Sequence, residues 1–450
     1  MKVLIAFAWP VLLFAQFAFA EDQFQSEPVR DQKWNFHFQT TVISQEHGEF
    51  PAKYSAPAPA TGSSTSLSNS VDNQSSLTLT IFAGRRLWQG AEFYVNPELS
   101  GGSGFNGTKG IAGFPNGEIY RVDDPSPKWS LARLFIKQTF ELGGEFVGLK
   151  DDKNQLAGSM KEEHVSVVVG RFSLSDYFDN LSVAHDPRTQ FMNWSLMDLG
   201  TWDYAADTRG YSWGFYVELV ERLWTLRYAN VMIPLQANQM DFDREYPTAS
   251  GNNLEFEYRY LVGEQKGAVH LIGWHNRANM GNYRNTINQS LRNTSGQLDV
   301  TLSRQMSEKY GLGLEFEQSL TSELNLFSRL GWDDGKTETW NFTEIDQTAS
   351  LGASLKGTKW NRANDTVGLA AVINGLSQDH RDYLANGGYG FMLGDGTLNY
   401  APEEIAELYY LYKVIPGFDF TGDFQYVQNP AYNSDRGPVS IVSCRVHYEM

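Results

Sequence analysis

The sequence predicts an all-β protein, a transmembrane antiparallel β-barrel of about sixteen strands. The clearest observation is segment 253–260, NLEFEYRY, in which apolar and aromatic residues occupy the even positions and charged residues the odd positions. Such an alternation with period two is typical of a strand that has one apolar and one charged face. The pattern recurs in GLGLEFE from Gly311 and in GFDFTGDFQY from Gly417.

The N-terminal segment indicates which of the two faces meets lipid. Lys2 precedes an apolar run over residues 3–19, and the triplet Ala-Phe-Ala at 18–20 ends before Glu21. These features are typical of a secretory signal peptide, which we predict over residues 1–20, with one domain over residues 21–450. In an exported chain that ends on an alternating strand, the apolar faces are expected to meet lipid and the charged faces a wet lumen.

Composition excludes several other classes of protein. The net charge is −17, and loss of Lys2 with the signal peptide brings it to about −18, which disfavours nucleic acid and anionic lipid as partners. No apolar run after the signal approaches the roughly 18 residues of a membrane helix, and the mean hydropathy is −0.40. Cys444 is the only cysteine, so no disulfide or thiolate metal cluster is expected within the chain.

Runs of period two that are bounded by turn residues predict the individual strands. An even number near sixteen falls in the range of barrels that leave an aqueous channel. The predicted strands are 34–43, 76–84, 90–99, 129–140, 164–172, 211–219, 223–232, 251–262, 266–277, 309–319, 322–333, 345–355, 365–374, 404–412, 417–428 and 438–449.

The connections between these strands mostly alternate between short and long, as a barrel with both termini in the periplasm requires. Short turns are predicted at 85–89, 220–222, 263–265, 320–321 and 413–416, and long loops at 44–75, 100–128, 173–210, 278–308 and 375–403. Segment 141–163 breaks the alternation, because it is a long connection on the side of the short turns. The sequence gives no physical account of that segment.

Four segments resemble a known family. They are GRRLWQGAEFYVNPELSGGSGF from Gly84, VGRFSLSDYFDNLSVAHDPRTQFMNWSLMDLGTWDYAADTRGYSWG from Val169, HRDYLANGGYGFMLGDGTLNYAPEEIAELYY from His380, and NPAYNSDRGPVSIVSCRVHYEM from Asn429. They are similar to the carbohydrate-selective porins of the OprB family. The resemblance implies a sixteen-stranded outer-membrane barrel, narrowed by inward-folded extracellular loops, through which mono- and oligosaccharides diffuse passively. It implies sugars and outer-membrane lipid as partners and leaves the association of several copies open.

The loop 173–210 is the best candidate to narrow the channel. A constriction for sugars needs hydrogen-bonding groups that replace lost hydration and still release the solute. Charged side chains bond to hydroxyls, and aromatic rings offer apolar faces to a pyranose ring. The candidate constriction residues of this loop are Asp186, Arg188, Trp194, Trp202, Asp203, Asp207 and Arg209. Some of the loop's charges can instead cap local turns.

Two neighbouring predicted strands add candidate residues to the channel wall. Glu92 and Glu98 share one parity of the third strand and face the lumen if Phe93 and Val95 face lipid. Arg133 and Lys137 share the inward parity of the fourth strand. Opposed acidic and basic walls would set up a transverse field that favours polar neutral solutes.

No catalytic or metal-binding residues are expected, and neither is a cofactor. The pairs Glu255/Glu257 and Glu315/Glu317 suggest a glycosidase, but a polar lumen places carboxylates at i and i+2 automatically. The histidines lack a compact ligand spacing. The alternative function is an exported glycan-binding or glycan-cleaving β-protein, which would keep the signal peptide and the aromatics. Extraction only by detergent would separate a barrel from that alternative.

Overall fold

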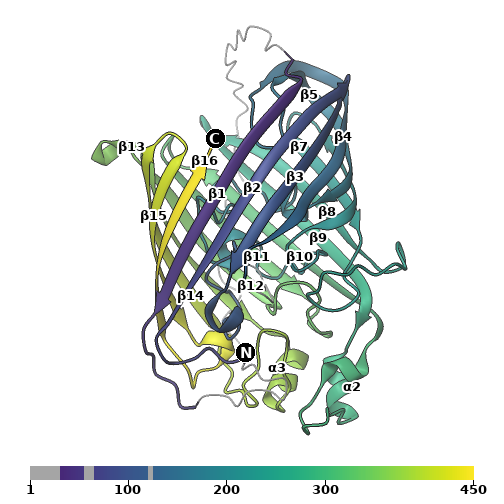
Figure 1. Cartoon of the computed structure of the whole chain (residues 1–450), viewed down its shortest axis with the longest axis vertical. Helices are drawn as coiled ribbons and strands as arrows, with labels where there is room; N and C mark the ends of the chain where they lie inside the picture. The colour runs from purple at the N-terminus through teal and green to yellow at the C-terminus, as the bar shows by residue number, and fades with distance from the viewer. Residues whose placement is uncertain (1–30, 55–64, 120–124) are drawn as a thin grey trace.

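The computed structural model describes residues 31–54, 65–119 and 125–450. The predicted signal peptide lies outside the described residues. Sixteen strands form one closed antiparallel barrel in which each strand pairs with its neighbours in sequence. The barrel closes where β1 pairs with β16, with Gln39 opposite Glu449. The prediction of a sixteen-stranded barrel is therefore confirmed (Figure 1).

The strands follow the predicted order, and several extend further than predicted. Their bounds are β1 Trp34–His47, β2 Asp72–Trp88, β3 Ala91–Gly102, β4 Lys128–Leu149, β5 Gly158–Phe172, β6 Ser212–Val220, β7 Trp224–Val231, β8 Ser250–Val262, β9 Gln265–Met280, β10 Gln305–Ser319, β11 Leu324–Asp333, β12 Gln347–Gly357, β13 Arg362–Gly375, β14 Glu403–Ile415, β15 Phe418–Gln428 and β16 Val439–Glu449. Three short α-helices lie in the connections: α1 Trp194–Met197, α2 Tyr283–Asn288 and α3 Gln378–Ala385. Within the described residues, these helices are too short and too polar to cross a bilayer.

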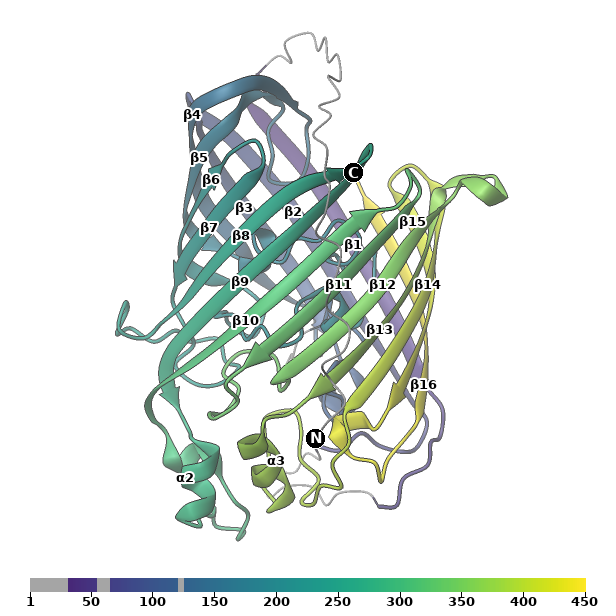
Figure 2. The ribbon, with the colours of Figure 1, turned by 180° about the vertical axis from the view of Figure 1, so that it is seen from behind.

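The two ends of the barrel differ in the length of their connections. Two-residue turns join β2 to β3, β8 to β9 and β14 to β15, and the C-terminus lies at the same end. The long loops, with α2 and α3, lie at the opposite end (Figures 1 and 2). Because outer-membrane barrels have short periplasmic turns and long extracellular loops, we call these the periplasmic and the extracellular end.

The outer face of the barrel carries the apolar side chains that the alternation predicted. On β8, Leu254 and Phe256 are 50% and 42% exposed, whereas Glu255 and Glu257 are 0% and 8% exposed. The same parity holds on β16, where Val442 is exposed and Arg445 and His447 are buried. The assignment of the two strand faces is therefore right.

The expectation of a wet lumen behind β8 is wrong. Arg227 of β7 donates to Glu255 at 2.5 Å and to Glu257 at 2.6 Å, and the backbone N–H of Asp179 donates to Glu255 at 2.8 Å. Asp179 belongs to the long loop between β5 and β6, which is folded into the barrel. The lumen on this side is therefore packed with loop residues instead of water.

The segment that broke the alternation, 141–163, is mostly strand. β4 continues to Leu149 and β5 begins at Gly158, and their pairing extends from Leu134 opposite Arg171 to Leu149 opposite Gly158. The register shifts near Gly143, and Gly144 has a positive φ of 77°. The two glycines permit a bulge that bends this hairpin, and its charged, irregular sequence hid the period of two.

Candidate functional site

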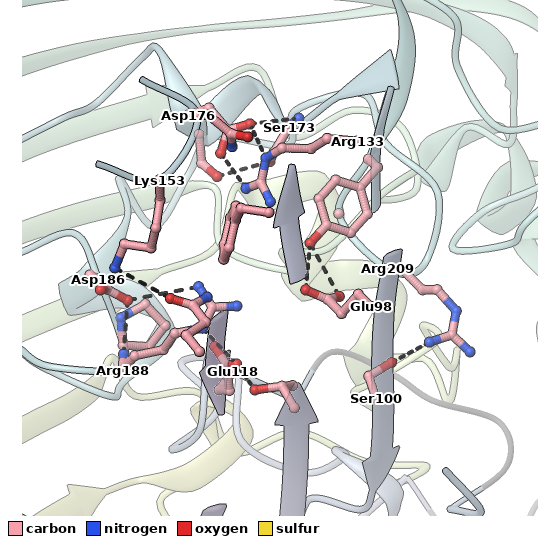
Figure 3. Close-up of a pocket in the computed structure, with 18 of the residues that line it drawn as sticks. Glu98, Ser100, Glu118, Arg133, Lys153, Ser173, Asp176, Asp186, Arg188 and Arg209 are labelled. Atoms are coloured by element: carbon pink, nitrogen blue, oxygen red, sulfur yellow. Dashed lines mark hydrogen bonds and ion pairs between the residues drawn. The ribbon is translucent and has the colours of Figure 1, made fainter. Parts of the chain in front are cut away.

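A cavity of about 380 Å³ lies inside the barrel against the wall formed by β1 to β4. Its lining comes from these strands, from the β3–β4 loop, from the loop between β5 and β6, and from the turn between β4 and β5. Figure 3 labels ten of the lining residues, among which Arg133 points toward Asp176, Lys153 lies beside Asp186, and Arg209 points toward Ser100. Two extracellular loops and one periplasmic turn therefore meet at a single cavity.

The β5–β6 loop, residues 173–211, is held in the lumen by charged side chains of distant strands. Arg329 of β11 donates to the carbonyl oxygens of Leu196 at 2.8 Å and Ala184 at 2.6 Å, and its Nε lies 2.7 Å from Asp179 Oδ1. Arg445 of β16 donates to the carbonyl oxygens of Pro187 at 2.6 Å and Gln190 at 2.8 Å. Buried polar groups need such partners, so these arginines fix the path of the loop.

Buried carboxylates of β14, which lies between β11 and β16 in the barrel, hold this loop and the β3–β4 loop. Glu407 of β14 accepts the backbone N–H groups of Met192 at 2.6 Å and Asn193 at 3.0 Å. Glu403, at the start of the same strand, accepts those of Ala112 at 3.0 Å and Gly113 at 2.8 Å from the β3–β4 loop. Both inward-folded loops are thus anchored to the barrel wall by charge-assisted hydrogen bonds.

Arg188 of the β5–β6 loop and Glu118 of the β3–β4 loop form an ion pair that joins the two loops. Nε of Arg188 lies 2.9 Å from Oε1 of Glu118, and Nη1 lies 3.9 Å from Asp186. Glu118 also accepts a hydrogen bond from Thr78 of β2. The Arg188 side chain is part-exposed, so its guanidinium reaches the cavity while it pairs with Glu118.

A second set of charges lies along β3 and β4. Arg133 forms a bidentate pair with Asp176 at 2.7 and 2.5 Å, and its guanidinium lies 5.2 Å from the ring centre of Tyr211. Glu98 accepts from Thr80 at 2.8 Å and from the Tyr211 hydroxyl at 3.1 Å. Arg209 donates to Ser100. The wall therefore presents acidic and basic groups side by side.

The cavity is more positive than the chain as a whole. Five of its lining residues are basic and four are acidic, whereas the chain has a net charge of −17. The basic residues are Arg133, Lys137, Lys153, Arg188 and Arg209, and the acidic ones are Glu98, Glu118, Asp176 and Asp186.

The pKa values of two of the three loop carboxyls that line the cavity, Glu118 and Asp186, shift in opposite directions. Burial raises the pKa of Glu118, and the neighbouring Arg188 compensates for this in part. Burial also acts to raise the pKa of Asp186, but Arg188 and Lys153 outweigh it and the pKa is lowered. Asp186 is therefore the more firmly ionised of the two groups.

The structure places five of the ten predicted site residues on the cavity and five elsewhere. Glu98, Arg133, Asp186, Arg188 and Arg209 line it. Trp194 and Trp202 are fully buried: Trp194 stacks on Phe114 at 5.0 Å between ring centres, and Trp202 packs on Tyr204 at 4.6 Å. The prediction that these two tryptophans contact the solute is therefore wrong, because both rings are buried against other aromatic rings.

Three predicted acidic residues also have structural partners away from the cavity. Asp203 accepts the backbone N–H groups of Trp340 at 2.9 Å and Asn341 at 2.8 Å, and Asp207 pairs with Arg171 at 2.5 Å. Glu92 accepts from the Tyr94 hydroxyl at 2.8 Å. Their carboxylates therefore organise loops and the wall of the barrel, which composition and strand parity could not reveal.

The residues that sequence reasoning missed come from separate segments. Glu118 lies in the β3–β4 loop and Lys153 in the β4–β5 turn. Asp176 caps its local turn, where it accepts the backbone N–H of Ser173 at 3.1 Å, and it also lines the cavity. The lining aromatic rings are those of Phe82, Phe135, Tyr177 and Tyr211. Phe135 lies on the same inward face of β4 as Arg133 and Lys137. The alternation of β4 was therefore the sequence signal that could have predicted an aromatic residue in the cavity.

One group of side chains has the composition of a metal site. Glu255, His270 and Glu315, from β8, β9 and β10, bring one ligand atom each within 4.8 Å of one another. Sequence spacing did not predict this cluster, because neighbouring strands bring it together. Arg227 already places a guanidinium 2.5 Å from Glu255, which supplies the positive charge that an ion would bring. We therefore describe the cluster as a buried ionic network.

A closed sixteen-strand barrel, loops folded into its lumen and a charged cavity against one wall define an outer-membrane porin. The model of the carbohydrate-selective porin, OprB family, matches residues 65–450. The chain belongs to this family, and its function is that of an outer-membrane carbohydrate channel.

Solved structures with the same fold are distant in sequence. The high-pH structure of Pseudomonas putida OprB is 15% identical, with 93% of this chain and 94% of that chain covered and a TM-score of 0.69. The outer membrane channel DcaP of Acinetobacter baumannii is 8% identical, with 93% and 97% covered and a TM-score of 0.50. Comparison with curated protein sequences gave no match.

Proposed function

We propose that sugars diffuse through this porin along the wall formed by β1 to β4, past the pair Arg188–Glu118 as the constriction. The observation that supports the proposal is the meeting of two inward-folded loops at this pair, beside a cavity of about 380 Å³. Elsewhere in the described part of the lumen, Trp194, Trp202 and Phe342 pack in a buried apolar cluster, which supports a path along the wall of β1 to β4.

The cavity offers hydrogen-bonding groups that replace the hydrogen bonds a sugar loses when it gives up its water. Arginine N–H groups donate to hydroxyl oxygens, carboxylates accept from hydroxyl hydrogens, and ring faces of Tyr177 and Tyr211 can lie against the apolar face of a pyranose. Several of these charged groups keep a protein partner, as Arg133 does with Asp176 and Arg188 with Glu118. A solute therefore shares hydrogen bonds with existing pairs, which keeps its binding weak enough for release.

The size of the cavity favours small sugars. Its volume lies near the lower end of the roughly 300 to 1,000 Å³ of small-molecule sites. We propose mono- and disaccharides as the preferred solutes and expect longer oligosaccharides to cross slowly. We further propose export by the signal peptide over residues 1–20, an outer face bathed in outer-membrane lipid, and a channel without catalytic activity. The sequence and the fold are compatible with association of several copies.

Planar-bilayer recordings of the full-length protein test this function. Monosaccharides and disaccharides added at rising concentration are expected to reduce the ion current in a saturable way. Polyethylene glycol of matched hydrodynamic size is the control, because it fills the path but has few hydroxyl donors. Equal reduction by both solutes, without saturation, would contradict a built sugar path.

A further inference from the structure

The connection between β4 and β5 is unlike the other periplasmic turns. The two strands extend beyond the neighbouring strands of the barrel before the chain reverses at residues 150–157. Figure 1 shows this hairpin arching over the end of the barrel opposite α2 and α3. Two-residue turns suffice for β8–β9 and β14–β15 at the same end, so the extra length needs its own explanation.

The tip of this hairpin is bound to β1 and to β3, which precede β4 in the barrel wall. Asn35 of β1 donates to the carbonyl oxygens of Asp152 and Gln155, both at 2.9 Å. Asn96 of β3 donates to Asn154 at 2.9 Å, and the backbone N–H of Leu156 donates to the Tyr94 hydroxyl at 3.2 Å. The hairpin therefore lies over β1 to β3 as a fixed element.

Two further contacts complete this anchoring. Leu156 is fully buried, and it packs in the same apolar cluster as Tyr94 and Phe135. His37 of β1 lies 3.0 Å from Asp151. A turn held by one buried apolar side chain and by polar contacts to β1 and β3 has little freedom to leave the mouth.

The tip also supplies the periplasmic floor of the cavity. Lys153, Asn154 and Gln155 line it together with Asp186 and Arg188 of the β5–β6 loop. Nζ of Lys153 lies 2.8 Å from Oε2 of Glu449, at the end of β16, and 3.3 Å from Oε1 of Gln39. Figure 3 shows Lys153 and Asp186 on the same side of the cavity. A periplasmic cation and an extracellular-loop carboxylate thus face the same space.

We propose that the turn 150–157 forms a second narrowing of the channel on the periplasmic side, with Lys153 as a selectivity-determining residue. The inference rests on the proposed function, because the solute that enters past Arg188 must leave past this turn. Lys153 can donate to a sugar hydroxyl or attract an anion while Glu449 and Gln39 hold its side chain. The channel would then have a second cationic contact, supplied by the periplasmic turn, near the pair Arg188–Glu118.

Cysteine chemistry on the full-length porin tests the proposal. Lys153→Cys is made in a Cys444→Ser background, so that the new thiol is the only one in the chain. In planar bilayers, methanethiosulfonate reagents that carry an ammonium, a neutral or a sulfonate group are added from the periplasmic side. Because each reagent adds bulk to residue 153, we expect all three to lower the single-channel conductance by about twofold or more. We expect anion preference to be greatest with the ammonium group and least with the sulfonate group.

The matched control is Glu264→Cys in the same background. Glu264 is exposed in the β8–β9 turn at the same end of the barrel, and it does not line the cavity described above. Its modification, confirmed by mass, is expected to leave conductance and selectivity unchanged. The proposal is overturned if modification at residue 153 behaves like this control, or if residue 153 fails to react in the open channel.

The two proposals fail in different ways. If sugars do not block the current of the unmodified porin in a saturable way, the sugar path is refuted. The reagent experiment still tests the periplasmic narrowing, because it measures ion current alone. Normal sugar block together with an inert residue 153 would refute the periplasmic narrowing alone. Heat-modifiable gel mobility confirms that each variant is a folded barrel before it is recorded.

Discussion

Removal of two cavity arginines should change the ion preference of the channel. Arg188 and Arg209 both line the cavity, where five basic residues face four acidic ones. The double variant Arg188→Ala with Arg209→Ala leaves three basic residues against four acidic ones, so the local excess of charge changes from positive to negative. Glu118 also loses its guanidinium partner at 2.9 Å and becomes a buried carboxylate with one remaining hydroxyl donor, Thr78.

The expected magnitude follows from Coulomb's law. One unit charge about 4 Å from a passing ion contributes about 1 kcal/mol at the dielectric constant of water, and more in a narrower, drier path. That energy corresponds to a factor of about five in relative permeability for each arginine removed. The carboxylates outside the cavity are screened beyond about 8 Å at physiological ionic strength, so they cannot replace the lost local charge.

The assay is the reversal potential in a salt gradient, combined with sugar block of the current. We expect a shift toward cations and weaker sugar block in the double variant. Arg284→Ala is the matched control, because Arg284 lies on α2 in the extracellular region and pairs with Asp379 and Asp382. An unchanged reversal potential in the double variant, or an equal shift in the control, would refute the assignment of the constriction.

Three further predictions concern the packing of the barrel and its loops. Glu257→Ala should lower the free energy of unfolding by about 1.5 to 3 kcal/mol, because Arg227 and Arg259 each lose a carboxylate partner while Arg227 keeps Glu255. Phe256→Arg should cost about 2 to 4 kcal/mol on the lipid face. Urea titration of the refolded barrel checks both, and an unaffected Glu257 variant would support a wet lumen at this site. Both carboxylate oxygens of Glu315 lack a hydrogen-bond partner among the described residues, so Glu315→Gln should keep or raise the free energy of unfolding. Elemental analysis of the purified porin should find no bound metal. A variant that loses both stability and a bound metal would contradict the ionic network. Burial acts to raise the pKa of Asp346, but His380, Lys309 and the backbone N–H of Ser377 together outweigh it and lower the pKa to about 2. The stabilising contribution of Asp346 is therefore present above the unfolded pKa near 4 and is lost as pH falls through about 2. The difference in melting temperature between the wild type and Asp346→Asn should shrink over that range, and a constant difference would refute the linkage.

The barrel could be predicted from the sequence because its signal is local. A period of two within one strand is enough to show which side chains face lipid, as it did for Leu254 and Phe256. Loop lengths then distinguish the two ends. The hairpin at 141–163 was missed because Gly143 and Gly144 interrupt that local period, although the pairing of β4 with β5 continues past them.

The site could be predicted only in part, because contacts between residues far apart in the sequence bring its side chains together. Asp186 and Asp203 lie in the same loop and have the same chemistry, yet Asp186 lines the cavity and Asp203 accepts backbone N–H groups from residues 340–342. Strand parity indicates that Arg329 points inward, but it cannot show that loop carbonyl groups at 184 and 196 cover it. The contacts that decide these roles join residues more than 130 positions apart.

The same long-range contacts explain why the total charge of the chain is a poor guide to its selectivity. Many acidic side chains act as acceptors for loop backbone, as Glu403 and Glu407 do, or pair with buried guanidinium groups, as Asp179 does with Arg329. Their charge is neutralised where it lies and does not reach the solute path. The residues that line the cavity include five basic and four acidic ones, although the chain carries −17 overall. The solute therefore meets the field of the cavity lining, which the inward-folded loops determine when they bury most of the other carboxylates of the lumen wall.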